Sequence, residues 1–67
     1  MVQTEELKKR MIASGLKTNY ICEQMGITRQ SLDMKINNKR PFRVSEIYVA
    51  CDLLKLSNEE KQSIFYA

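Results

Sequence analysis

Residues 29–37 concentrate side chains that can bond to the exposed edges of nucleic-acid bases. Gln30 carries a donor and an acceptor on one amide, which suits bidentate pairing with adenine, and Arg29 suits guanine or a phosphate. Met34 offers an apolar contact for a thymine methyl group. These residue types favour nucleic-acid contact, although ordinary solvation of a helix surface would also account for Gln30 taken alone.

Helical periodicity indicates which of these side chains face outward. Leu32 and Ile36 are the clear core positions of a predicted helix at 29–37, and Met34 then points almost directly away from them. Asp33 opposes a phosphate path unless it accepts from a cytosine amino group or orients a nearby arginine. The predicted base-contacting residues are Arg29, Gln30, Ser31, Asp33 and Met34.

The positive charge of the chain is concentrated on the same stretch. Residues 28–43 hold five cations and one anion, whereas the rest of the chain holds six cations and seven anions. Such clustering is the electrostatic signature expected of a phosphate-binding surface, although a solvated basic surface would explain any single charge. The predicted phosphate-contacting residues are Lys17, Thr18, Asn37, Asn38, Lys39, Arg40 and Arg43.

Short-range signals place this stretch after two other helices. Thr4 is the predicted N-cap of a first helix, which ends at Gly15. A second helix is predicted at 18–25, and Gly26 closes it in the left-handed conformation. Thr28 is well suited to cap the helix that follows. The predicted inward residues of the first two helices are Leu7, Met11, Ile12, Ala13, Ile21, Cys22 and Met25.

The second half of the chain is also predicted to be helical. Residues 37–41 form a loop, because Pro41 lacks an amide donor and restricts its predecessor. A fourth helix is predicted at 44–54, and the capping-box pattern at 57–60 begins a fifth. No segment alternates at period two, so we predict one all-α domain of five helices over residues 1–67. Its fourth helix buries Val44, Ile47, Ala50, Cys51 and Leu54.

Composition argues against several classes of protein. The chain has no histidine and only two cysteines, Cys22 and Cys51, which we expect to be free thiols in the core. No metal, cofactor, small-molecule substrate or catalytic constellation is expected, so the chain is not predicted to be an enzyme. The opening residues lack the apolar stretch of a signal peptide, and no run approaches the roughly 20 apolar residues of a membrane span. A cytoplasmic protein is therefore expected.

Nearly the whole chain, residues 7–65, resembles the Cro/repressor-like helix-turn-helix family (the XRE-type regulators), especially its small phage and prophage members. Residues 26–39, Gly-Ile-Thr-Arg-Gln-Ser-Leu-Asp-Met-Lys-Ile-Asn-Asn-Lys, look like the family's turn, recognition helix and following loop. Residues 42–47 and 57–65 also look like family segments. The resemblance implies a five-helix, lambda-repressor-like domain whose third helix enters the major groove.

The resemblance also implies roles for particular residues. In such domains the first, second and sixth residues of the recognition helix commonly reach bases, and the start of the second helix and the later loop grip phosphates. By position these are Arg29, Gln30 and Met34 for bases, and Thr18, Asn37 and Lys39 for phosphates.

The chain departs from the family pattern at four positions. Lys17 stands where a capping Thr is usual, and Cys22 stands at a position that is often alanine. Asp33 and Met34 replace residues that are often Ser and a cation, which bears on base readout.

Two functional hypotheses follow. The first is a sequence-specific transcriptional regulator that binds an operator in double-stranded DNA, an inverted repeat bound by a homodimer. The copies would pair through residues 64–66 or only on the DNA, although the same residues would equally well close the core. The alternative is a helical protein-interaction module, an anti-repressor or inhibitor, that keeps the fold without specific DNA binding. Fold resemblance alone does not decide between them.

Overall fold

The computed structural model describes residues 2–66, so the first and last residues of the predicted 1–67 domain lie outside the described range. Within that range the chain forms five α-helices and no strand, which confirms the all-α prediction. The helices are α1 (Thr4–Ser14), α2 (Thr18–Met25), α3 (Arg29–Ile36), α4 (Val44–Leu54) and α5 (Asn58–Phe65). Their positions agree closely with the predicted ones, except that α3 ends one residue before the predicted Asn37.

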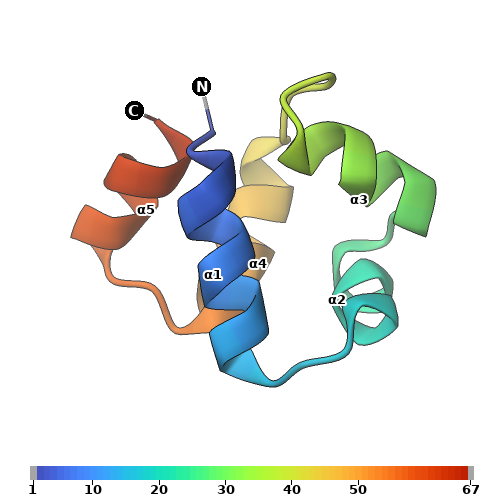
Figure 1. Cartoon of the computed structure of the whole chain (residues 1–67), viewed down its shortest axis with the longest axis horizontal. Helices are drawn as coiled ribbons and strands as arrows, with labels where there is room; N and C mark the ends of the chain where they lie inside the picture. Colours follow the sequence, from blue (N-terminus) through green and yellow to red (C-terminus); the bar gives the residue numbers. More distant parts are fainter. Residues whose placement is uncertain (1, 67) are drawn as a thin grey trace.

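Helices α1 and α4 form the centre of the fold. In Figure 1, α5 lies on one side of this central pair and the α2–α3 unit lies on the other. Helix α4 contacts α1, α2 and α5, so it joins the two sides. An edge-to-face contact between the Phe42 and Phe65 rings, with centroids 5.3 Å apart, links the α3–α4 loop to α5. The buried apolar residues are Leu7, Ile21, Cys22, Leu32, Ile36, Ile47, Ala50, Ile64 and Phe65.

The helix ends follow the predicted signals with one exception. Gly26 has a φ of 71° and closes α2, while the Thr28 hydroxyl accepts a hydrogen bond from the Ser31 N–H at 3.1 Å and caps α3. The prediction that Thr4 caps α1 is wrong, because Gln3 occupies the N-cap position. The Gln3 N–H donates to the Ile64 carbonyl at 2.7 Å, and this contact with α5 sets where α1 begins.

Three residues predicted to face the core lie on the surface instead. Ile12 is 81% exposed, and its neighbour Ala13 is also exposed. The buried side of α1 follows Leu7 and the half-buried Met11, and Ile12 lies about 100° further around the helix. Val44 is 61% exposed, since it is the first residue of α4 and the buried residues of this helix begin at Glu46.

The C-terminal apolar residues close the core. Ile64 and Phe65 are almost fully buried, so neither is available as a surface through which two copies could pair. Tyr66, the third residue of that predicted surface, remains exposed. The structure therefore favours core closure over pairing for this part of α5.

A buried ion pair connects α3 to α4. The Lys35 Nζ donates to both carboxylate oxygens of Glu46 at 2.6 Å, and the two side chains are only 8% and 6% exposed. Glu46 also accepts a hydrogen bond from the Arg43 N–H at 2.9 Å. Lys35 was counted among the cations of residues 28–43, but it belongs to the interior. Removing either partner would leave an unpaired buried charge, at a cost of about 3–5 kcal/mol.

Titration of the Glu46 carboxyl makes the free energy of unfolding depend on pH in the acid range. Burial alone would raise its pKa, but hydrogen bonds from Lys35 and from the Arg43 N–H outweigh burial and lower the pKa below its ordinary value of 4.5. Because the folded-state pKa is depressed, the stabilisation is complete above pH 4.5 and is lost as the pH falls through the folded-state value. Urea unfolding should show native protein more stable than Glu46→Gln at pH 7, with the difference shrinking in acid. Glu23→Gln, at an exposed carboxylate, is the control and should show little change.

The two threonines provide a matched test of helix capping. Thr28→Ala removes the bond to the Ser31 N–H and should lower the free energy of unfolding by about 1 kcal/mol. Thr4→Ala is expected to have almost no effect, because Thr4 lies inside α1 and does not cap it. Thermal unfolding of both variants measures the difference. Equal losses would contradict the observed assignment of the two caps.

Candidate nucleic-acid interface

Helix α3 presents its first turn to solvent. Leu32, Lys35 and Ile36 form its buried side, and they pack the helix against the rest of the domain. Arg29 and Gln30 open the helix and are both exposed. Since the helix begins after the closed turn at residues 25–28, its start is held in a defined direction.

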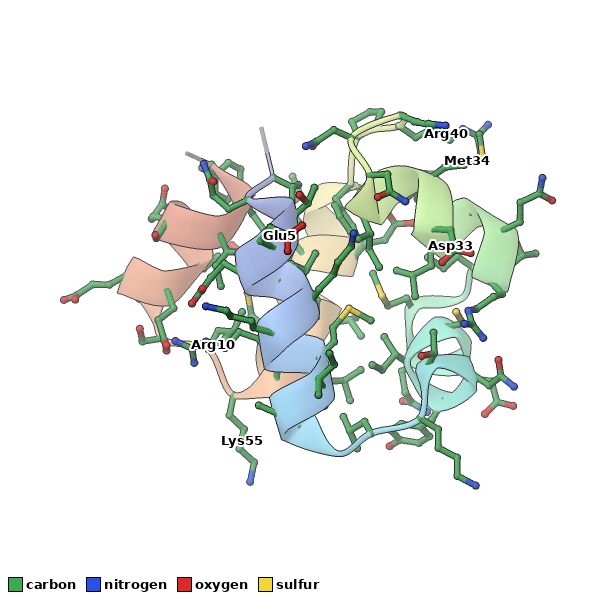
Figure 2. All side chains as sticks on the ribbon, in the orientation of Figure 1. Glu5, Arg10, Asp33, Met34, Arg40 and Lys55 are labelled. Atoms are coloured by element: carbon green, nitrogen blue, oxygen red, sulfur yellow. The ribbon has the colours of Figure 1, made fainter. Side chains whose placement is uncertain are left out.

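The other predicted base-contacting residues differ in exposure. Asp33 is exposed, whereas Ser31 and Met34 are half-buried. The Lys39 N–H donates to the Met34 carbonyl at 2.8 Å, which brings the loop back against the last turn of α3 and limits the exposure of that turn. Figure 2 shows Met34 and Arg40 at the same corner of the molecule, where α3 meets the α3–α4 loop.

Asp33 lies beside Arg29 on the surface of α3. The Asp33 carboxylate is 4.0 Å from the Arg29 Nε, and the two side chains are 61% and 60% exposed. An exposed pair at this spacing contributes little to stability. So weak a contact does not fix the guanidinium, and the suggested role of Asp33 in orienting a nearby arginine stays a prediction.

The loop between α3 and α4 contains two asparagines that bond within the chain. The Asn37 amide donates to the Asp33 carbonyl at 2.8 Å, and its oxygen accepts from the Lys8 Nζ at 3.5 Å. The Asn38 amide donates to the Val2 carbonyl at 3.0 Å, and its oxygen accepts from the Val2 N–H at 3.1 Å. Both were predicted to contact phosphate, and such a contact by either side chain now requires an exchange of partners.

The cations of the loop are more accessible. Lys39, Arg40 and Arg43 are exposed, and Arg40 and Arg43 both line a polar hollow of about 460 Å³. Ser31 from α3 and Ser45 from α4 line the same hollow, as do the buried Lys35 and Glu46. The structure therefore brings one predicted base-contacting residue and two predicted phosphate-contacting residues to the same depression.

The start of α2 provides the remaining predicted contacts. Lys17 is exposed at the N-cap position of α2 and makes no side-chain capping bond, and Thr18 is half-buried. The first N–H groups of a helix with no side-chain cap are suited to an anion. Figure 1 shows the α1–α2 connection and the α3–α4 loop at opposite ends of the α2–α3 unit. The two predicted phosphate-contacting groups thus flank α3 on different sides.

Two features of this surface were not predicted from the sequence. The position of Lys35, three residues after Leu32 and next to Ile36, places it on the inward side of α3, and Glu46 stands next to the inward Ile47 in the same way. Asp33 has equivalent neighbours in Leu32 and Ile36 and is nevertheless exposed, so such neighbours are not by themselves a signal of burial. The pairing of Asn38 with Val2 left no signal either, because it joins positions 36 residues apart through main-chain atoms.

The cysteines are free thiols, as predicted. Cys22 is buried between α2 and its neighbours, and Cys51 is half-buried on α4. Burial raises the pKa of the Cys22 thiol, although the nearby Arg29 guanidinium partly opposes this rise. The Cys51 thiol likewise has a raised pKa because of burial. Both groups therefore stay protonated near neutral pH and behave as small core residues.

The described part of the chain shows no group of three His, Cys, Asp or Glu residues that could hold a metal ion. Among its helices, none has the length and apolar character needed to cross a membrane. Comparison with models of protein families, with curated proteins and with solved structures produced no match.

Proposed function

We propose that this chain is a sequence-specific DNA-binding transcriptional regulator of the Cro/repressor-like, XRE type, which inserts α3 into the major groove of duplex DNA. One observation carries the proposal. The first turn of α3 exposes Arg29 and Gln30, the loop after its last turn carries three exposed cations, and Leu32 and Ile36 anchor the helix in the core. Such a helix on a basic rim is the arrangement that groove-reading domains use.

The residues divide into two kinds of contact. Gln30 can pair with adenine through both amide atoms, and Arg29, which lies beside Asp33, can pair with guanine. Lys39, Arg40 and Arg43 would contact backbone phosphates, which give affinity without sequence information. Lys17 and Thr18 at the start of α2 would contact the phosphates on the other side of α3.

A homodimer on an inverted repeat fits this proposal, because a single domain presents one recognition helix. Two copies would place their helices in half-sites about 34–36 Å apart. With Ile64 and Phe65 buried, the exposed apolar residues available for pairing include Val44 and Tyr48, four residues apart on α4, together with Tyr66. The same exposed residues favour a second candidate function, a helical protein-interaction module that acts as an anti-repressor or inhibitor.

The salt dependence of DNA binding separates these two functions. We expect the native protein to bind a random-sequence duplex, with an affinity that falls as salt rises. On a log–log plot the slope should be about −0.9 per phosphate neutralised, and so several units in total for a dimer. Fluorescence anisotropy with a labelled duplex from 50 to 200 mM salt measures it. No binding at the lowest salt would favour the protein-interaction module.

A pair of variants tests the division into base and phosphate contacts. Gln30→Ala should weaken binding to preferred sites, selected from random duplexes, by about 1–3 kcal/mol while binding to other sequences changes little. Lys39→Ala should weaken binding to all sequences about equally and reduce the salt slope by about one. A uniform loss in both variants would mean that Gln30 does not read bases.

A further inference from the structure

We propose that Lys35 and Glu46 are positioning residues for the DNA-binding surface: their buried contact fixes the α3–α4 loop and so sets where its cations stand relative to α3. This inference rests on the proposed function. Neither side chain is free to touch DNA, because each is more than nine-tenths buried and each is the other's partner. Their influence would therefore act through the backbone they hold.

The ion pair joins the two helices on either side of the loop. Lys35 lies in the last turn of α3 and Glu46 in the first turn of α4, so the contact joins the two ends of the intervening segment. The same carboxylate accepts the Arg43 N–H, which fixes the last residue before α4. The Glu46 carboxylate therefore links the backbone at Arg43 to the Lys35 side chain, and so to α3.

A second anchor holds the loop where it leaves α3. Asn38 has a φ of 60°, in the left-handed region, and its side chain makes two hydrogen bonds with the main chain of Val2. Gln3, which follows Val2 in the chain, donates its N–H to the Ile64 carbonyl of α5. The loop is thus held at its α4 end by Glu46 and at its α3 end by the N-terminal segment. A loop ordered in advance loses less conformational entropy when it binds.

The chemistry of the pair favours positioning over simple stabilisation. A buried ion pair costs desolvation, and an apolar pair of similar volume often gives equal or greater stability. Apolar packing is non-directional, however, whereas the bonds from the Lys35 Nζ to both Glu46 oxygens specify a geometry. The pair therefore adds to the fold mainly a fixed relation between α3 and α4.

The test replaces the ion pair with apolar residues. The double variant Lys35→Met, Glu46→Leu is expected to keep its helix content and a melting temperature near or above that of the native protein. Its affinity for duplex DNA should fall about tenfold, and its salt slope should become shallower, because the loop cations are no longer held in place. Lys35→Arg, which retains the charge, should recover most of the affinity. Arg10→Met breaks a half-buried ion pair with Glu60, remote from the loop, and is the control that should bind DNA normally.

A second measurement does not depend on DNA. Amide hydrogen exchange and NMR relaxation of residues 37–43 should show a more mobile loop in the double variant than in the native protein. If the double variant does not fold, Glu46→Gln carries the same measurement, since the amide keeps the shape of the side chain but removes the charge that binds the Lys35 Nζ.

The outcomes separate this inference from the proposed function. Native loop order together with native affinity and salt slope in the double variant would overturn the positioning role. Failure of the native protein to bind any duplex would instead overturn the proposed function. The loop measurement would then decide the positioning inference alone, with increased mobility supporting it and unchanged mobility overturning it.

Discussion

The small buried side of α3 is the constraint on which the rest of the structure depends. A helix of two turns has too few residues to be stable alone, so it exists because Leu32 and Ile36 are buried against the other helices. That anchorage uses one side only, which leaves Arg29 and Gln30 free in the first turn. The shallow packing of α3 therefore both stabilises the helix and leaves its first turn exposed. A helix packed more deeply would have lost this exposed surface.

The fold could be predicted almost completely from local signals, because α1, α2, α3 and α5 each begin or end at a residue with a strong conformational preference. Gly26 and Thr28 fix the turn before α3 regardless of what packs around it. Thr4 failed as a predicted cap because the chain before α1 bonds to α5, and local preference contains no information about that contact. Ile12 failed because helical spacing identifies an apolar stripe but not how much of it a neighbouring helix will cover.

The candidate site could be predicted only in its exposed part. Gln30 is exposed as predicted, since the positions of Leu32 and Ile36 determine the opposite side of the helix. Arg29 is predicted nearer the core edge, where only its length lets it reach outward, and it too is exposed. Lys35 cannot be told from the other cations by sequence, because its partner lies eleven residues further on and across the loop. Contacts of this kind depend on how two helices meet, and a single sequence does not specify that angle.

The tie between Asn38 and the N-terminal segment has a consequence for how this chain can change. Because the Asn38 amide bonds to the N–H and carbonyl of Val2 and not to its side chain, many amino acids could stand at the second position without breaking the contact. An insertion or deletion between Val2 and α1 would shift these groups out of register. The connection is thus tolerant of substitution and sensitive to spacing.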